Sequence, residues 1–525
     1  MKDATKACGG ENGPFKIGPV PQFFLDSRFI SDGEGVELRM TPALNAGPVL
    51  LPERPWEMYR ISPSSVIHDQ GVYKMWYRAI SAYAGVAGTV ACPRCSIENP
   101  GSKIVCIKCG WPLTDIDWLH QTLFHKCFAV STDGIKWERP DLGLVEYDGD
   151  TKNNIFQFTG SLCVPSVNPL GPPEEKFIAL SQCDHKLFLS VSPDGLRWTR
   201  KPDPVLPFCA DTNNQIIYDP ALRKYVAFLR GFPGRRTTVR CEFDNLDQTP
   251  WPFTDRGRKP DDTGTCYIED ELETVMDIDA GDPPLPGLDI NHISAIHYTD
   301  GVYLGFPGMF RKYPGGLDRQ GREDHRYFAQ GNDGSFETQL AVSRDGRRWT
   351  RPDRCAYMCQ GLLGELDGGI TLMAPGMIHR DNEIYQYYGG NRVTHGILNP
   401  GEDNHVGGIF RTVQIKDRFI SVSAGMKGGR FVTPLLSHTG NCLQLNIDCQ
   451  GLGETFVQIR DRQGRVIPGH ARNDCDPVDL NQLCHTVRWR GNADLPPESS
   501  GPIQLEFFMR SARLYTFTLH ASSVP

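Results

Sequence analysis

A seven-residue pattern, Ser-x-Asp-Gly-x-x-Trp, occurs three times in the chain and limits the folds that the chain can adopt. The copies are Ser131–Trp137, Ser192–Trp198 and Ser343–Trp349, and each precedes a Pro-Asp pair. An Asp-Gly pair between strand-forming residues is a strong hairpin signal, because Gly tolerates the positive φ of a tight turn. The Trp gives the returning strand a large side chain to bury. Three copies indicate a repeated β unit.

A second pattern, in which an apolar strand, a turn and an aromatic-rich strand follow one another, predicts the number of units. It occurs at Val66–Tyr77, Pro165–Leu180, Ile216–Leu229, Ala295–Phe306 and Met377–Tyr388. Together with the Asp-Gly hairpins, these segments predict five four-stranded sheets, which is a five-bladed β-propeller over residues 22–425. A TIM barrel is disfavoured because helical periodicity is almost absent. An array of β-sandwiches stays open as the alternative fold.

Two segments lie outside this pattern. Residues 88–115 interrupt the first unit and contain two Cys-x-x-Cys pairs, and residues 426–525 lack the Asp-Gly-Trp repeat. In the second segment, stretches such as Thr455–Arg460 and Leu514–Leu519 alternate apolar and polar residues, which predicts an antiparallel β-sandwich. The predicted fold class is therefore all-β, with a five-bladed propeller, a C-terminal sandwich and a small insert in the first blade.

The composition excludes several other classes of protein. Among 525 residues, 55 Lys and Arg stand against 63 Asp and Glu, and this net charge of −8 disfavours nucleic acid as a partner. No apolar run approaches the roughly 18 residues of a membrane helix, so no membrane partner is expected. A secretory signal is not visible, and the 17 cysteines lack the spacing of a small disulfide-bonded domain. We expect a cytoplasmic protein, unless the sequence has lost a leader.

The two cysteine pairs are the most specific local signal in the sequence. Cys92, Cys95, Cys106 and Cys109 have the spacing of a tetrahedral Cys₄ zinc site in a short ribbon. Four thiolates would fill the coordination of one Zn²⁺ and leave no position for water, so the ion is expected to be structural. Redox pairing of the same cysteines is the alternative. No organic cofactor is implied.

Several stretches resemble the five-bladed glycoside hydrolase propellers, the broad group that contains fructan- and arabinan-cleaving enzymes. The chain is most similar to the branch described as glycosyl-hydrolase-like. The resemblance is carried by Ser343–Trp349, Phe24–Ser27, Arg54–Glu57, Lys74–Arg78, Tyr387–Gly390, Thr394–Gly396 and Ile467–Gly469. The strand motifs of the fructan-cleaving families are absent, and the hairpins lack the extra residue of the sialidase Asp-box. The resemblance implies the fold and cleavage of a glycosidic bond, and fold transfers better than activity.

In a four-stranded blade the connections alternate between two faces of the propeller. The short Asp-Gly turns fall on one face, so the long connections and the starts of the innermost strands share the other, here called the upper face. Acids lie just before the innermost strands in four predicted units: Glu57, Asp211, Asp289, Glu365 and Asp367. For any one of them, capping of a turn is the structural alternative.

Cleavage of a glycosidic bond needs one carboxyl group as proton donor and a second as nucleophile or base. We therefore predict that Asp211 and Asp289 face one another across a central funnel, with Glu57 and Asp367 completing the ring. Asp289 is the expected proton donor, and Glu365 or Asp367 is the alternative.

The connections on the upper face are also basic, which favours an anionic ligand because the Arg guanidinium fits carboxylate, sulfate and phosphate. A solvated rim of charges is the structural alternative. The hypothesis is a glycosidase that acts on an oligo- or polysaccharide, with an anionic sugar as one candidate substrate. A glycoside phosphorylase that uses inorganic phosphate and a non-catalytic carbohydrate-binding propeller are the alternatives. Substrate binding is expected from Arg60, Asn154, Asn213, His292, Arg326, Arg392 and His395. The sequence does not set the linkage or the oligomeric state.

Overall fold

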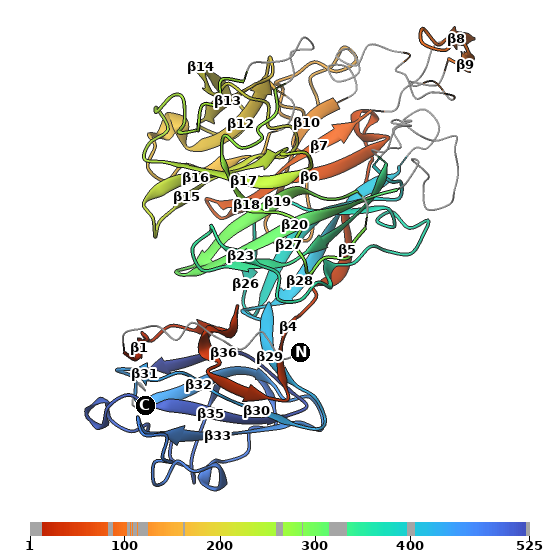
Figure 1. The fold of residues 1–525 in the computed structure, drawn as a ribbon. Helices are drawn as coiled ribbons and strands as arrows, with labels where there is room; N and C mark the ends of the chain where they lie inside the picture. The colour runs from red at the N-terminus through yellow and green to blue at the C-terminus, as the bar shows by residue number, and fades with distance from the viewer. Residues whose placement is uncertain are drawn as a thin grey trace.

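The structure is a computed structural model, and it describes residues 13–81, 88–101, 106, 108, 113, 124–160, 163–258, 266–285, 287–313, 333–395 and 405–520 (Figure 1). Its regular structure is β, apart from short 3₁₀ turns, so the all-β prediction is confirmed. Within these residues no helix has the length and apolar character that a membrane crossing requires. Two predicted site residues, Cys109 and Arg326, lie outside the described part of the chain. The 3₁₀ turns are η1 (Ser27–Phe29), η2 (Pro55–Glu57), η3 (Pro173–Glu175), η5 (Arg472–Asp474) and η6 (Glu498–Ser500).

The larger body, at the top of Figure 1, consists of antiparallel sheets that follow one another along the chain. The first sheet has the order β6 (Arg60–Asp69), β7 (Val72–Ile80) and β10 (Phe124–Ser131). The second contains β11 (Ser166–Val167), β12 (Phe177–Cys183), β13 (Lys186–Ser192) and β14 (Thr199–Leu206). The third contains β15 (Gln215–Asp219), β16 (Lys224–Gly231), β17 (Thr237–Phe243) and β18 (Glu273–Met276).

The remaining strands of this body form one larger sheet, in which two halves meet at a parallel contact between Phe336 and Ile370. One half contains β19 (Leu288–Thr299), β20 (Val302–Lys312), β21 (Gly334–Gln339), β22 (Ala341–Ser343), β23 (Trp349–Thr350) and β24 (Ala356–Met358). The other contains β25 (Ile370–Met373), β26 (Ile378–Arg380), β27 (Glu383–Asn391), β28 (Gly407–Ile415) and, from the N-terminal part of the chain, β5 (Leu44–Leu50). The pairing of β28 with β5 joins the two ends of the body.

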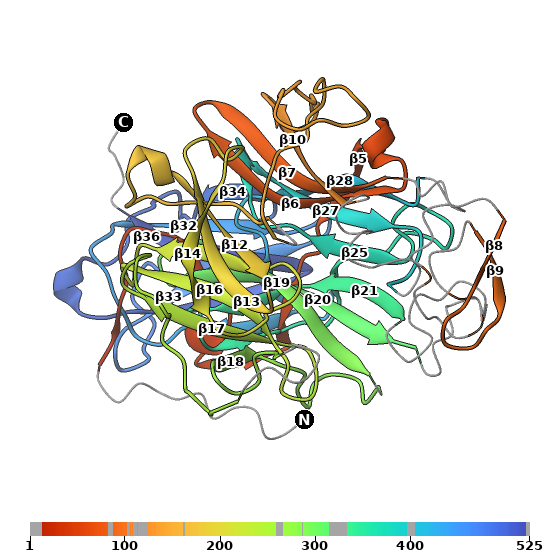
Figure 2. The same ribbon diagram turned by 90° about the horizontal axis from the view of Figure 1, so that it is seen from above.

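All five hairpins expected from the sequence are present, as β6–β7, β11–β12, β15–β16, β19–β20 and β26–β27. Figure 2 shows the sheets arranged around a common centre. Residues of β6, β11, β15 and β19 and of the β25–β26 connection line one shared cavity of about 340 Å³. Because these strands are far apart in sequence, the cavity marks the axis of the body.

Hydrogen bonds join neighbouring inner strands directly. The Ser65 hydroxyl donates to the carbonyl of Pro165 at 2.8 Å, and the Ser294 hydroxyl donates to that of Met373 at 2.6 Å. The Gln215 amide both donates to and accepts from the backbone of Ala295, at 2.8 and 2.9 Å. These contacts hold the inner strands in fixed positions relative to one another.

The three Asp-Gly motifs form the same turn. In the second copy the Ser192 hydroxyl accepts from the Gly195 amide at 2.9 Å. The Asp194 carboxylate accepts from the backbone amides of Leu196 and Arg197, both at 2.8 Å. Gly195 has φ +81°, and its carbonyl accepts a hydrogen bond from the Trp76 indole of the preceding sheet at 2.6 Å. In the first copy the carbonyl of Gly134 accepts from the Tyr387 hydroxyl, also at 2.6 Å. The motif therefore closes a turn and attaches it to a neighbouring sheet.

The smaller body contains both ends of the described chain. One of its sheets contains β34 (Asn481–Thr486), β32 (Cys442–Asp448), β36 (Ala512–His520), β29 (Ile420–Ala424), β4 (Val36–Met40) and β2 (Gln22–Phe23). The other contains β3 (Asp32–Glu34), β30 (Gly429–Val432), β35 (Gln504–Arg510) and β33 (Glu454–Arg460). The short strand β1 (Phe15–Lys16) pairs with β31 (Leu436–Ser437).

The predicted domain limits of 22 and 425 stay a prediction, and strand pairing crosses both of them. Strands β2, β3 and β4 pair with C-terminal strands, and Phe24 and Phe29 are buried in the same hydrophobic cluster as Phe507 and Phe517. Strand β29, which ends at Ala424, also belongs to these sheets. Alternation of apolar residues shows that a strand has a buried face, but it does not show which sheet the strand joins.

We expect Gly195→Ala to lower the free energy of unfolding by about 2–4 kcal/mol, because it adds strain at positive φ and overpacks a buried contact. A Cβ atom on Gly195 would lie 2.4 Å from the Trp76 ring. Gly301→Ala is the matched control, since Gly301 has φ +65° and nothing within 4 Å of its Cβ position. The control should lose only about 1 kcal/mol in denaturant unfolding. Equal losses in the two variants would contradict the role given to the turn contact.

Candidate functional site

A cluster of acids and bases lies at the upper ends of the third sheet and of β19 and β20. The half-exposed carboxylate of Asp211 accepts a hydrogen bond from the Arg230 guanidinium at 2.5 Å. The buried carboxylate of Asp289 contacts Arg236 at 3.1 Å and Lys312 at 2.7 Å. Both acids are therefore held by ion pairs, and these two groups are together called the Asp211–Asp289 network below.

Electrostatics connects the two ion pairs of this network. Partial burial disfavours the charge of Asp211, but Arg230, the Thr212 amide and Arg236 outweigh it and lower the pKa of Asp211. Arg236 thus acts on Asp211 while it contacts Asp289. Burial lowers the pKa of Arg230 to about 10, although Asp211 opposes this effect. Asp211 is consequently an ionised carboxylate that solvent reaches, which is the state that a base or nucleophile requires.

His292 lies beside this network on β19. Its Nδ1 atom lies 3.1 Å from the Asn291 side-chain oxygen, and the Asn291 carbonyl accepts from Arg230 at 2.9 Å. Burial, followed by repulsion from Arg230, lowers the pKa of His292 to about 4. The imidazole is therefore neutral at pH 7. In that form it can offer one donor and one acceptor, but no charge, to a ligand.

The side chains of Glu57 and Asn154 form hydrogen bonds with other buried groups of the protein. The fully buried Glu57 carboxylate accepts from the Tyr77 hydroxyl at 2.6 Å and from Arg139 at 2.9 Å. Asn154 donates to the same Tyr77 hydroxyl at 2.5 Å and accepts from the Trp56 indole at 3.0 Å. These contacts satisfy both side chains within the fold, and the catalytic role of Glu57 and the substrate-binding role of Asn154 stay predictions.

Glu365 and Asp367 approach each other over Gly361. A Cβ atom on Gly361 would lie 2.1 Å from an Asp367 oxygen and 2.6 Å from a Glu365 oxygen, so both carboxylates border the same point. The buried Asp367 accepts from the Tyr388 hydroxyl at 2.7 Å and from the Asn45 amide at 3.3 Å. Asn45 belongs to β5, the outer strand of its sheet, so these contacts do not bring Asp367 to Asp211. The predicted ring of acids around one funnel stays a prediction.

The other predicted ligand-binding residues have different surroundings. Arg392 is exposed, and Asn213 is half-buried in the turn before β15. The His395 ring packs on Phe310 and Phe336, with ring centroids 5.0 and 5.4 Å away. Arg60, at the start of β6, is half-buried and lies over the Tyr59 ring at 5.7 Å.

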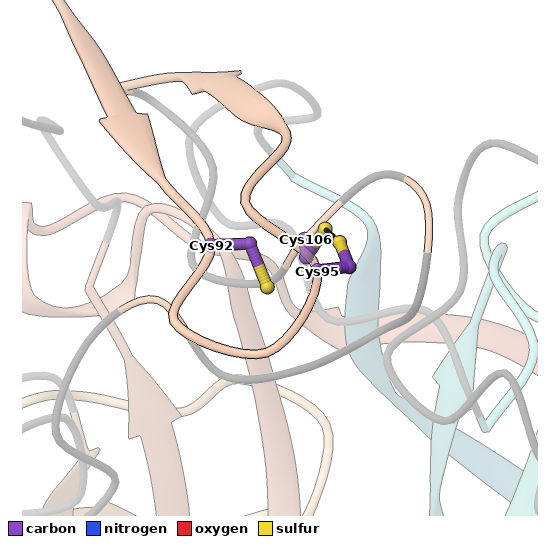
Figure 3. Close-up of side chains that lie close together, drawn as sticks. All are labelled: Cys92, Cys95 and Cys106. Atoms are coloured by element: carbon purple, nitrogen blue, oxygen red, sulfur yellow. Dashed lines mark hydrogen bonds between the residues drawn. The ribbon is translucent and has the colours of Figure 1, made fainter.

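Three of the four predicted metal ligands lie together in the insert of the first sheet (Figure 3). The hairpin of β8 (Thr89–Ala91) and β9 (Glu98–Pro100) presents Cys92 and Cys95 toward Cys106, and the three sulfur atoms all lie within 4.8 Å of one another. The Cys92 sulfur also accepts from the Arg94 amide at 3.4 Å. Sulfur atoms bound to one Zn²⁺ at about 2.3 Å would lie roughly 3.8 Å apart. The cluster can therefore hold a metal ion.

Three basic residues near these sites were not predicted: Arg78, Lys126 and Arg139. Arg78 stands in the Lys74–Arg78 stretch, where alternation places it on the same strand face as Trp76. The pairing of Lys126 with Arg78, and of Arg139 with Glu57, depends on strand register across a long insert. No local sequence pattern predicts how these strands align with one another.

No family model matches the chain, and no curated protein matches it. Solved structures match at low identity. Proteins described as belonging to the GH130 family of mannoside phosphorylases, with glycoside hydrolases that target β-1,2 mannosidic linkages in Candida mannan, share 14% identity at a TM-score of 0.41. That match covers 72% of this chain and 95% of the other.

A glycosyl hydrolase from Bacteroides ovatus also gives 14% identity and a TM-score of 0.41, over 73% of this chain and 95% of the other. An N-acetylgalactosamine deacetylase from F. plautii, in complex with blood group B trisaccharide, gives 12% and 0.36, over 73% and 96%. Several of these neighbours are thus named as carbohydrate-active enzymes. Such low identities and TM-scores do not bear on the chemistry of this chain.

We expect the protein to lose stability as the pH falls from about 6.5 to about 4, in part through His292. The folded-state pKa of His292, about 4, lies below its ordinary value, so the unfolded chain takes up the proton first and acid favours unfolding. The full effect is about 3 kcal/mol. His292→Asn should flatten this part of the stability–pH curve in denaturant unfolding, whereas His68→Asn, at an exposed position, should not. An unchanged curve for His292→Asn would contradict the prediction.

Proposed function

We propose that the chain is a carbohydrate-active enzyme that cleaves a glycosidic bond on the upper face of a five-bladed propeller. In this proposal each hairpin begins one blade, with β5 completing the last, and the sheets at residues 15–40 and 420–520 form a bracing β-sandwich. The carbohydrate substrate enters where the inner strands start. The observation that carries the proposal is the half-exposed, ionised carboxylate of Asp211, held by Arg230 beside the buried pair of Asp289 and Arg236.

The geometry favours different roles for the two acids. Asp211 is accessible and its pKa is lowered, so it suits the base or nucleophile. Asp289 is buried and contacts two cationic side chains, Arg236 and Lys312. Such neighbours favour an ionised carboxylate, whereas a proton donor must be protonated. We therefore assign Asp289 to positioning Arg236 and Lys312. Glu365 and Asp367 stay the sequence-based alternatives for the proton donor.

We expect Asp211→Asn to reduce kcat by about 10²- to 10⁴-fold, because the amide cannot act as base or nucleophile. Activity is measured on a panel of neutral and anionic oligosaccharides, with and without inorganic phosphate. Asp300→Asn is the matched control, because Asp300 lies in the turn between β19 and β20 and its side chain is 93% exposed. Full activity of Asp211→Asn, with unchanged thermal unfolding, would exclude Asp211 from the reaction.

We also propose that the cysteine cluster holds one structural Zn²⁺, with Cys109 as the fourth ligand. The three described sulfur atoms support this because their mutual distances suit ligands of one ion. The ion would fix the hairpin of β8 and β9 against the segment that carries Cys106.

Elemental analysis of metal-replete protein should give about one zinc per chain, and Cys92→Ser should lose it while the main body still unfolds cooperatively. Cys484→Ser, at an exposed position outside the cluster, should keep the zinc. Absence of stoichiometric zinc from the unmodified protein would overturn this proposal.

A further inference from the structure

Three cations form a row on one face of the first sheet, at its upper end. Arg78 of β7 lies opposite Lys126 of β10 on one side and opposite Ser62 of β6 on the other. Residues directly opposite one another in antiparallel strands project from the same face, with Cβ atoms about 4.5–5.5 Å apart. Arg60, two residues before Ser62, projects from this face as well. Arg78 and Lys126 also line one small cavity together.

No carboxylate balances these charges among the residues that the structure describes. Within that part of the chain, Arg60, Arg78 and Lys126 form no ion pair and no side-chain hydrogen bond, and the Nε atom of Arg60 is buried without a partner. Their described contacts are with aromatic rings: Arg60 lies over Tyr59, and Arg78 lies over Phe124 at 5.6 Å.

Other buried arginines near the upper face do have acidic partners. Arg230 pairs with Asp211, and Arg139 pairs with Glu57, in each case with a side chain no more than 8% exposed. The acids closest in sequence to Arg60 and Arg78 are already occupied, because Glu57 accepts from Tyr77 and Arg139 and Asp69 binds two lysines. Among the described residues, neighbouring arginines thus have counter-charges, whereas this row has none.

The neighbouring thiols cannot supply the missing charge. Burial raises the pKa of Cys163, beside Lys126, well above its ordinary value, so the thiol is neutral. Burial, and then repulsion from Arg60, lowers the pKa of Arg78 to about 9. Burial likewise lowers the pKa of Lys126, and Arg78 adds to this effect. An anion placed among the three groups would remove both penalties, because charge-assisted hydrogen bonds favour the charged forms.

We propose that Arg60, Arg78 and Lys126 bind an oxyanion at the upper end of the first sheet. Phosphate, sulfate and the carboxylate of a uronic acid all present several negatively charged oxygen atoms. Two guanidinium groups and one ammonium group can donate hydrogen bonds to such oxygens. The anion comes either from free inorganic phosphate or from a charged group on the sugar. Its link to glycoside cleavage rests on the proposed function, but binding itself does not.

Isothermal titration of the full chain with inorganic phosphate, sodium sulfate and a galacturonate oligosaccharide tests this site, at constant ionic strength held with KCl. Saturable binding of phosphate and sulfate alone assigns a free oxyanion, and binding of the oligosaccharide alone assigns an anionic sugar. Arg78→Met should raise the Kd of the bound probe at least about tenfold, because it removes a charge-assisted contact.

Arg411→Met is the matched control. Arg411 also has a buried Nε atom without a partner and lies over an aromatic ring, Tyr385, at 4.3 Å, but it belongs to β28. It should leave the Kd unchanged. Thermal unfolding without any probe shows whether both variants are folded, and Lys126→Met replaces Arg78→Met if that variant is not.

The proposal is overturned if none of the three probes binds saturably at millimolar concentration, or if Arg78→Met and Lys126→Met bind as tightly as the unmodified chain. Because binding is measured without turnover, an inactive protein that binds the probe would contradict the proposed function and not this site. An active protein that binds no anion would contradict this site alone.

Discussion

The hydrogen bonds between inner strands are the constraint on which the rest of the larger body depends. Ser65, Gln215 and Ser294 each reach across to the backbone of the neighbouring inner strand, where the hydroxyl or amide finds the partner that a buried polar group requires. Asp211 lies just before β15, and Asp289 lies at the start of β19. The hydrogen bonds between these two strands therefore also restrict the distance between the two acids. Outer contacts, such as that of Trp76 with the turn at Gly195, then set the angle between successive sheets.

A second constraint is that charge can be buried only with compensation, and this rule separates structural from functional groups. Glu57 receives donors from Tyr77, Arg139 and the backbone, so its lone pairs are used within the fold. Asp211 differs because one guanidinium holds it while half of its side chain faces solvent. A reacting carboxylate needs that combination of fixed orientation and access, which Glu57 lacks.

Much of the fold could be predicted because its determinants are local. The Asp-Gly turns use a Ser hydroxyl, an Asp carboxylate and a Gly within four residues, so the sequence alone carries the complete hydrogen-bonding pattern. The N-terminal strands of the smaller body could not be assigned to it, because residues 22–40 pair with partners about 380 to 495 positions away. In the candidate site, the positions of Asp211 and Asp289 near the starts of inner strands could be predicted from local sequence, and their catalytic roles stay predictions. The contact of Arg139 with Glu57 and the position of Lys126 opposite Arg78 arise only through strand register.

The first sheet shows how these constraints act together. The turn η2 just before its first strand carries the buried and compensated carboxylate of Glu57, and its strands carry the row of Arg60, Arg78 and Lys126, which has no acidic partner among the described residues. Alternation places Tyr77 and Arg78 on opposite faces of β7, so one face buries a closed network while the other concentrates positive charge. A random surface charge would be free to turn toward solvent, but these side chains stay half-buried on a rigid sheet. The positive field is therefore fixed in place before any ligand arrives, which is the preorganisation that selective anion binding requires.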